Sequence, residues 1–207
     1  MVNACLAIVC GYLLGSIPSA YIAAQLKRTV DIRDVGSKNM GAMNVYYEVG
    51  LREAVLVLIA DVGKGIGAIL IARYLLGVPL PFQLLTGLAA VIGHMLPGFL
   101  KFRGGKGGAT ALGILLFLMP HAVPFFLAIA VAALLITHNF TFCYSVAFIC
   151  FPLVAWLIYH SMPMTIFSIG VPVLLGINYI PRLKNMHTAT GGNWRRVIKR
   201  GSLKERI

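Results

Sequence analysis

The sequence predicts an all-α, polytopic membrane protein with about seven transmembrane helices, and three observations lead to this fold class. The chain has 207 residues, of which 59% are hydrophobic and only 12% charged, whereas soluble domains carry about 25% charged residues. Three long stretches, residues 1–26, 74–100 and 107–181, contain no charged side chain when His is counted as neutral. A bilayer core of about 30 Å needs roughly 20 apolar residues per helix. The composition therefore excludes a soluble globule or a disordered chain, and the apolar runs do not alternate as a β-barrel requires.

Seven apolar segments along the chain are expected to form the membrane helices. The first covers residues 3–26 and is interrupted by Gly15 and Pro18. It lacks a basic start and a clear cleavage site, so we expect a retained helix rather than a signal peptide. The other six segments are residues 51–76, 82–100, 108–119, 122–137, 142–159 and 163–180. The fourth segment is too short to cross upright at 1.5 Å per residue, and a re-entrant half-helix is the alternative there.

The positive charges are concentrated on alternate connections between these segments, which predicts the topology. On one side of the membrane, residues 27–50 hold four Lys or Arg and residues 101–108 hold three. On the same side the turn at residues 138–139 holds none, and the end of the chain, residues 182–207, holds eight. The intervening connections hold none, at residues 77–81, 120–121 and 160–163. The positive-inside rule then places the N-terminus outside and the C-terminus in the cytoplasm.

The basic end of the chain follows a transmembrane domain that we place at residues 1–180. The net charge is +12, and the tail, residues 181–207, contributes eight bases and one acid. Such a tail could bind nucleic acid, but after seven spans it indicates contact with anionic lipid. We therefore expect membrane lipid and no nucleic acid among the partners.

The first polar cluster lies between the first two apolar segments, at residues 36–44. Ser37, Asn39 and Asn44 offer neutral donors and acceptors, and the glycines let backbone N–H groups approach a ligand. The same composition suits a turn that caps the following helix. The residues alone leave both interpretations open.

The second polar cluster, residues 93–108, closes the third apolar segment and opens the fourth. Small residues before a helix expose N–H groups, the helix dipole adds partial positive charge, and Arg103 and Lys106 could complete an anion site. The spacing is not that of the nucleotide-binding P-loop, and an ordinary membrane loop also uses Gly and Lys. His94 is either a packing residue at the membrane edge or part of the site.

Two opposite charges lie inside the second apolar segment, three residues apart. Asp61 and Lys64 share one helix face, and an intramembrane ion pair is either functional or a structural lock. The four cysteines lie in apolar stretches without C-x-x-C spacing, so we expect core residues rather than metal ligands or disulfides. Anion-binding groups at a membrane edge suit a reaction between a phosphorylated water-soluble molecule and a lipid.

Four motifs follow one another over about residues 8–113. They are Tyr12-Leu-Leu-Gly-Ser-Ile-Pro18, residues 36–44, Asp61-x-x-Lys64-Gly65, and Gly93-His94-x-x-Pro97-x-Phe99-x-x-Phe102-x-Gly104-Gly105-Lys106-Gly107. Their order and spacing resemble the bacterial membrane glycerol-3-phosphate acyltransferases that use acyl-phosphate as donor. The last motif is the most specific, and from residue 122 onward the likeness is mainly hydropathy.

The resemblance implies acyl transfer from a fatty acyl-phosphate to the 1-hydroxyl of glycerol 3-phosphate, giving lysophosphatidic acid. It implies seven transmembrane helices in a bacterial inner membrane, an active site facing the cytoplasm, and neither a metal nor a nucleotide cofactor. From it we expect three catalytic residues, Ser37, His94 and Lys106. The expected substrate-binding residues are Asn39, Asn44, Arg103, Gly104, Gly105, Gly107, Thr141 and Asn193.

Three positions depart from the pattern of this family. Met43 stands where Thr is usual, and Tyr47 stands where a phosphate-binding Arg is expected. Thr190 occupies the place of a His three residues before Asn193, and His187 lies nearby but off register. Two alternatives follow: a degenerate member that binds lipid or phosphate without turnover, or a small anion transporter. The absence of a clear internal repeat argues against the transporter.

Overall fold

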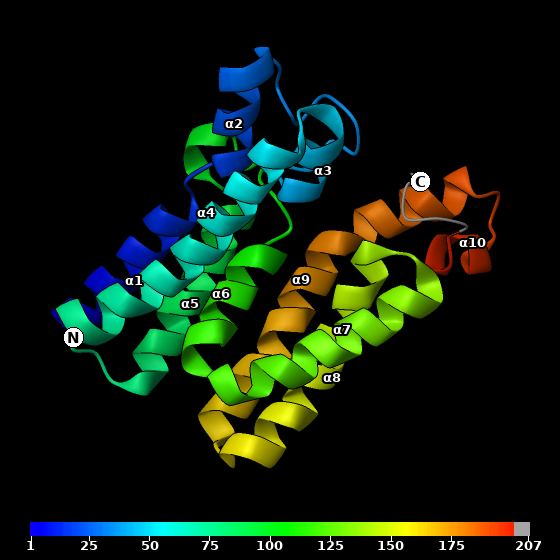
Figure 1. Ribbon diagram of the computed structural model, residues 1–207. Coiled ribbons are helices and arrows are strands. Elements are labelled where there is room, and N and C mark those ends of the chain that lie inside the picture. The colour runs from blue at the N-terminus through cyan, green and yellow to red at the C-terminus, as the bar shows by residue number, and fades with distance from the viewer. Residues whose placement is uncertain (201–207) are drawn as a thin grey trace. The chain divides into compact units, whose positions relative to one another are not determined.

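The computed structural model describes residues 1–200, and among these it contains helices and no strand (Figure 1). Within this range six helical segments are long and apolar enough to cross a membrane, and Gly108–Leu118 is a shorter apolar helix. The predicted class, an all-α polytopic membrane protein, is confirmed. The chain divides into two compact units, Met1–Leu118 and Met119–Ile207, and each is described by itself.

The first unit is built from two long helix pairs and a smaller polar cap. Pro18 lacks a backbone N–H, so the first apolar segment breaks there into two helices, as its sequence predicted. In chain order the elements are α1 (Val2–Gly15), α2 (Ser19–Arg28), α3 (Ala42–Glu48), α4 (Leu51–Leu70) with its π-helical end η1 (Ile71–Leu75), α5 (Leu80–Met95), the 3₁₀ turn η2 (Gly98–Leu100) and α6 (Gly108–Leu118).

Glycines allow the long helices of this unit to touch backbone to backbone. On α1, a Cβ at Gly15 would collide with the Ala90 carbonyl of α5. On α4, a Cβ at Gly65 would collide with the Thr110 carbonyl of α6. Lipid provides no hydrophobic force between helices, so association in a membrane depends on such close van der Waals packing. The pairs α1–α5 and α4–α6 therefore form the rigid frame of the unit.

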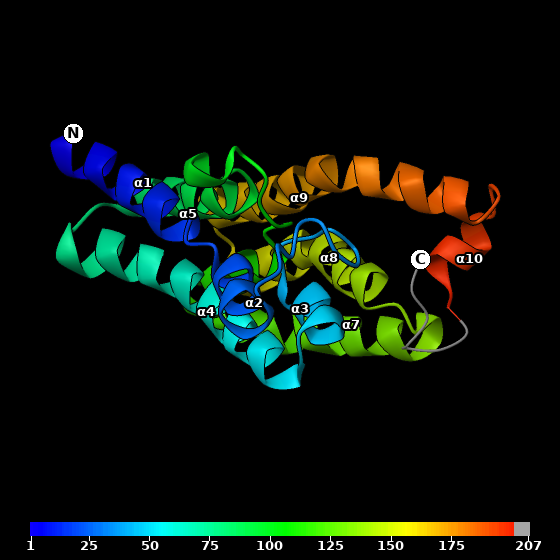
Figure 2. The same cartoon turned by 90° about the horizontal axis from the view of Figure 1, so that it is seen from above.

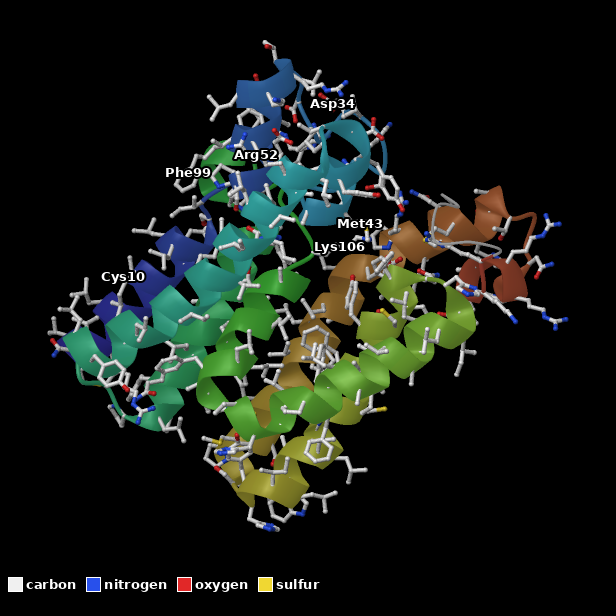
Figure 3. All side chains as sticks on the ribbon, viewed as in Figure 1. Cys10, Asp34, Met43, Arg52, Phe99 and Lys106 are labelled. Atoms are coloured by element: carbon white, nitrogen blue, oxygen red, sulfur yellow. The ribbon has the colours of Figure 1, made fainter. Side chains whose placement is uncertain are left out.

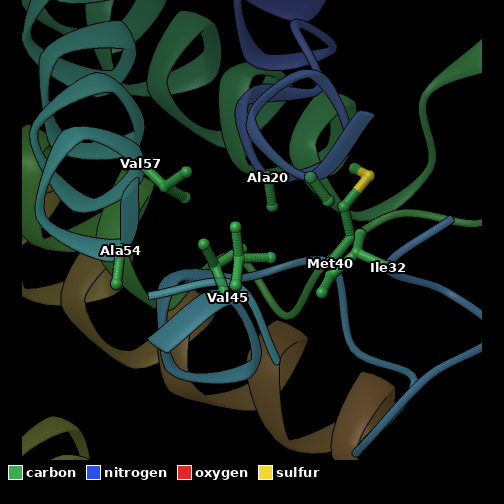
Figure 4. Close-up of a cluster of buried hydrophobic side chains, with 8 residues drawn as sticks. Ala20, Ile32, Met40, Val45, Ala54 and Val57 are labelled. Atoms are coloured by element: carbon green, nitrogen blue, oxygen red, sulfur yellow. The ribbon is translucent and has the colours of Figure 1, made fainter. Parts of the chain in front are cut away.

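The polar segment between α2 and α4 is anchored by its own small hydrophobic cluster (Figure 4). Ile32 and Met40 from the connecting loop and Val45 from α3 are almost completely buried there. They pack against α2 and α4, whose contributions include Ala20 and Val57. This packing fixes the loop at residues 29–41 and the residues of the first polar cluster within it.

The second unit is a helical hairpin followed by one long helix and a short one. Its elements are η3 (Pro120–Ala122), α7 (Val123–Thr137), α8 (Phe140–Tyr159), α9 (Met162–Ala189) and α10 (Trp194–Ile198). Phe126 of α7 packs edge-to-face on Phe148 and Phe151 of α8, with ring centroids 4.9 and 6.0 Å apart. Asn139, in the turn between α7 and α8, joins this hairpin to α10.

α9 continues well past the expected end of the last apolar segment at residue 180. It contains Pro181 in its interior and ends at Ala189, with α10 following after a short turn (Figures 1 and 2). The residues after 180 are therefore helical as far as 189. A boundary between a transmembrane domain and a basic tail at 180/181 stays a prediction.

Candidate active site

The connection at residues 101–108, called the glycine-rich loop from here on, folds back over the C-terminal end of α5. The N–H of Gly104 donates to the Met95 carbonyl at 3.1 Å, and the N–H of Gly105 donates to the His94 carbonyl at 3.0 Å. These bonds satisfy carbonyls that the helix end leaves without partners. Both glycines are required by space, because a Cβ on either would collide with the backbone of α5 or with the His94 ring.

Lys106 follows these glycines directly and lies at the entrance to α6. Its side chain is half-buried, and Figure 3 shows it on the chain that leads into this helix. Gly107 has a φ of 83°, which glycine adopts without strain, and the helix begins at the next residue. A cation, flexible backbone and the N-terminus of α6 thus lie together, as the sequence predicted.

The two polar clusters of the sequence meet in space. A Cβ at Gly105 would collide with the carbonyl of Met40, so the loop at residues 36–41 borders the glycine-rich loop. Arg33 strengthens this junction, because its Nη1 donates to the Leu100 carbonyl at 3.1 Å. From the sequence, Arg33 was expected only to add positive charge to its connection, so this link between the loops was not predicted.

Arg33 is itself held by Asp31 and Tyr21. Its Nε and Nη2 donate to the Asp31 carboxylate at 2.9 and 2.6 Å, and its guanidinium lies 5.2 Å from the centre of the Tyr21 ring. The hydrogen bonds from Arg33 lower the pKa of Asp31 below its usual value. An Asp and an Arg two residues apart in a loop are the signal that could have indicated this pair, because Arg and a carboxylate form strong charge-assisted hydrogen bonds.

Asn44 is buried and its amide is used by the backbone of the preceding loop. Its Oδ1 accepts from the Ser37 N–H at 2.9 Å, and its Nδ2 donates to the carbonyls of Ile32 and Val35 at 2.9 and 3.1 Å. Both amide hydrogens are thereby occupied. Asn44 thus holds the Ser37 backbone in place, and the substrate contact that we expected of it stays a prediction.

Of the other expected ligand residues in the first unit, Asn39 is half-buried in the same loop and Arg103 is exposed. Arg103 lies 3.4 Å from Asp34, and both of these side chains are more than 60% exposed. Arg103 thus lies at the outer edge of the glycine-rich loop.

Asp61 and Lys64 form the buried ion pair that their spacing suggested. Lys64 Nζ lies 2.9 Å from Asp61 Oδ1, and the two side chains are only 5% and 2% exposed. Asp61 Oδ1 also accepts from Ser19 Oγ at 2.5 Å, and Lys64 Nζ donates to the Ile17 carbonyl at 3.1 Å. The sequence did not indicate the third member, His94, whose Nδ1 lies 3.6 Å from Asp61 Oδ1.

Thr141 and Asn193 belong to the second unit. Thr141 lies in the first turn of α8, where its N–H donates to Asn139 Oδ1 at 3.1 Å. The Asn193 side chain caps α10 by accepting from the N–H groups of Arg195 and Arg196. Thr190, in the place of the family's His, donates its hydroxyl to backbone carbonyls, and the His187 ring stacks on Trp194 at 4.2 Å. Substrate contacts of Thr141 and Asn193 stay predictions.

Taken with the fold, this site defines a class: a polytopic membrane protein with a glycine- and lysine-rich loop at the junction of two helix ends. The family model described as glycerol-3-phosphate acyltransferase matches residues 5–188. The chain therefore belongs to the glycerol-3-phosphate acyltransferase family, and the resemblance inferred from its motifs is confirmed.

Individual relatives agree with this assignment over nearly the whole chain. Glycerol-3-phosphate acyltransferase 2 of Dehalococcoides mccartyi strain CBDB1 is 45% identical over 203 residues, 98% of this chain and 96% of the relative. The enzyme of Thermoanaerobacter sp. strain X514 is 35% identical over 90% of this chain and 93% of its own. The crystal structure of the integral membrane glycerol 3-phosphate acyltransferase PlsY in its glycerol 3-phosphate form has a TM-score of 0.82 at 33% identity, covering 92% of this chain and 94% of that one. Its lysophosphatidic acid form has a TM-score of 0.81.

Proposed function

We propose that this glycerol-3-phosphate acyltransferase takes its acyl group from a fatty acyl-phosphate and releases lysophosphatidic acid and inorganic phosphate. The 1-hydroxyl oxygen of glycerol 3-phosphate forms a bond to the acyl carbon, and the bond from that carbon to the phosphate oxygen breaks. The hydroxyl proton leaves to a phosphate oxygen of glycerol 3-phosphate. His94 was the alternative base expected from the sequence, but its ring is buried between Asp61 and Gly105. The observation that supports this proposal is the glycine-rich loop, in which Lys106 lies just before the N-terminus of α6.

The physical argument rests on the charges of the two substrates. An acyl-phosphate is already activated, so the enzyme must bring two anions together and stabilise the charge that develops on the leaving phosphate. Backbone N–H groups, a helix N-terminus and a lysine are the groups that bind phosphate in proteins. The N–H groups of Gly104 and Gly105 already donate to the end of α5, so these two glycines shape the loop. Lys106, the backbone at Gly107 and the N-terminus of α6 are assigned to the phosphate.

Ser37 and Asn39 are assigned to the second substrate on this proposal. They lie in the loop that borders Gly105, and Asn44 fixes the Ser37 backbone. Neutral donors there orient glycerol 3-phosphate without adding to its charge. Tyr47 stands where the family has a phosphate-binding Arg, so this chain binds glycerol 3-phosphate with one cation fewer.

A direct assay tests the reaction. Purified protein in a lipid mesophase receives palmitoyl-phosphate and labelled glycerol 3-phosphate, and palmitoyl-coenzyme A replaces the donor in a parallel reaction. We expect lysophosphatidic acid from the phosphate donor alone. Lys106→Met should lower kcat/KM by roughly 10²-fold or more, as removal of an electrostatic stabiliser does. Lys184→Met removes an exposed lysine of α9 and serves as the matched control.

Each failure of this assay has a distinct meaning. Product from the coenzyme A donor alone would refute the donor class. Binding of either substrate without product would indicate a degenerate member, which the departures at Met43 and Tyr47 would then explain. Flux of glycerol 3-phosphate into liposomes without acylation would indicate an anion transporter.

The proposed location of the site is the cytoplasmic face of a bacterial inner membrane. The bases of the loops and tail support it, because Lys and Arg accumulate on the cytoplasmic side of membrane helices. If a reporter that works only in the cytoplasm is fused to the C-terminus, we expect it to be active. A reporter active only in the periplasm would place the glycine-rich loop away from any cytosolic substrate.

A further inference from the structure

We infer that Asp61, whose charge Lys64 balances, orients the His94 ring through its carboxylate oxygen, so that the ring supports the glycine-rich loop. His94, Asp61 and Lys64 are then positioning residues that act on the reaction through Gly105 and Lys106. The catalytic part of this inference rests on the function proposed above. Its structural part concerns the loop alone.

The ion pair ties together three segments that are distant in sequence. Asp61 and Lys64 belong to α4, Ser19 and Ile17 lie at the break between α1 and α2, and His94 lies in the last turn of α5. Lys64 reaches the Ile17 carbonyl at 3.1 Å because Pro18 interrupts the helix and leaves that oxygen accessible. The pair therefore fixes where the end of α5 lies relative to two other helices.

The His94 ring spans the distance between this pair and the loop. Its Nδ1 faces Asp61 Oδ1 at 3.6 Å, and among the described residues this buried nitrogen has no hydrogen-bond partner. Its opposite edge, Nε2 and Cδ2, lies against Gly105 so closely that no Cβ could be placed there. The ring is 4% exposed. Such a covered edge supports the loop rather than reaching a substrate.

Electrostatics explains why the ring takes one orientation. Asp61 attracts the Nδ1–H of a neutral imidazole, so Nδ1 is the protonated nitrogen and Nε2 faces the loop. Lys64 balances the carboxylate, since a buried carboxylate without a partner would be unstable in a membrane interior. The residue that follows Gly105 is Lys106, so a shift of the ring displaces the lysine of the proposed phosphate site.

Two double variants separate the orienting contact from the charge pair itself. Asp61→Leu with Lys64→Met removes both charges and also the oxygen that faces His94. Asp61→Asn with Lys64→Met removes both charges but keeps an acceptor oxygen at that position. His94→Phe leaves the ion pair intact and keeps a flat ring, so it tests the same contact if the first variant fails to fold. The control is Lys27→Met with Glu53→Gln. It removes another ion pair, between α2 and α4, whose lysine is exposed.

The experiment measures hydrogen exchange at the Gly104 and Gly105 amides, kcat of acyl transfer, and the midpoint of thermal unfolding in detergent. For Asp61→Leu/Lys64→Met and for His94→Phe we expect these amides to exchange at least about tenfold faster, the equivalent of one lost hydrogen bond. We expect kcat to fall by roughly tenfold to a hundredfold. Asp61→Asn/Lys64→Met should restore slow exchange and most of the kcat.

Two results would overturn the inference. One is slow exchange and a normal kcat in both Asp61→Leu/Lys64→Met and His94→Phe, which would make the pair a structural lock only. The other is equal loss in the Asn and Leu double variants, which would assign the effect to the charges rather than to His94. If the wild type transfers no acyl group, the proposed function fails, whereas the exchange rates still decide whether His94 supports the loop.

Discussion

Asn139 offers the sharpest test of how the second unit is held together, because its one side chain performs two separable tasks. Its Oδ1 caps α8 by accepting from the N–H groups of Thr141 and Phe142 at 3.1 and 3.3 Å. Its Nδ2 donates to the carbonyls of Val197 and Ile198 of α10 at 2.9 and 3.3 Å. Substitution by Ser keeps a good helix cap but is too short to reach α10, whereas substitution by Ala removes both functions.

The expected magnitudes follow from these contacts. Each of the two donated hydrogen bonds contributes about 1 kcal/mol net, so Asn139→Ser should weaken the docking of α10 by ~2 kcal/mol. That corresponds to roughly a 30-fold increase in local opening. Asn139→Ala should weaken α10 equally and also destabilise the start of α8 by about 1 kcal/mol, the usual value of a lost cap.

Hydrogen exchange and limited trypsin digestion in nanodiscs measure the two effects separately. Faster cleavage after Arg195 and Arg196 reports the opening of α10, and exchange at the Thr141 and Phe142 amides reports the cap. Asn185→Asp, an exposed change on α9, is the control. The reasoning fails if Asn139→Ser leaves the cleavage rate unchanged, or if it frees the α8 amides as much as Asn139→Ala does.

Three further predictions concern the first unit. Gly105→Ala places a methyl group on the His94 ring, so it should destabilise the protein by about 1–3 kcal/mol in thermal unfolding, and an unchanged midpoint would contradict the packing. Arg33 lowers the pKa of Asp31 in the folded state, below its ordinary value of 3.8. The pair therefore stabilises the loop fully at pH values above 3.8. This stabilisation is lost as the pH falls through the lower pKa of the folded state. Loop exchange measured from pH 5 downward should show this loss, and Arg33→Gln should abolish it; an identical acid response in the variant would be evidence against the assignment. Tyr47→Arg should lower KM for glycerol 3-phosphate by restoring a phosphate-binding cation, and an unchanged KM would mean that Tyr47 does not border the substrate.

The sequence predicted those features that depend on neighbouring residues. Uninterrupted apolar runs gave the helices, Pro18 gave the break, and the three-residue spacing of Asp61 and Lys64 gave their contact. The glycine-rich loop was likewise predicted to precede a helix, and α6 begins at Gly108. All of these follow from local geometry, which periodicity and residue type describe well.

What the sequence did not predict depends on tertiary contacts. The amide of Asn44 could equally have served a ligand, and only the folded loop shows that Ile32, Val35 and Ser37 occupy it. The approach of His94 to Asp61 joins residues of two different helices. α9 was expected to end where its apolar residues end, but a helix can leave the membrane and continue in water, because its hydrogen bonds need no lipid.

The glycine contacts between α1 and α5 have a consequence for biosynthesis. Gly15 meets Ala90, which the ribosome adds about 75 residues later, a delay of roughly 4 to 15 s at ordinary rates of translation. During that interval the face of α1 that α5 covers in the folded protein has no partner, although α4, which also packs on α1, has already been made. A larger residue at Gly15 would leave insertion of α1 unaffected and block the later docking of α5. Such a variant should therefore be found in the membrane at normal amounts early in synthesis and be lost to proteolysis only after α5 has emerged.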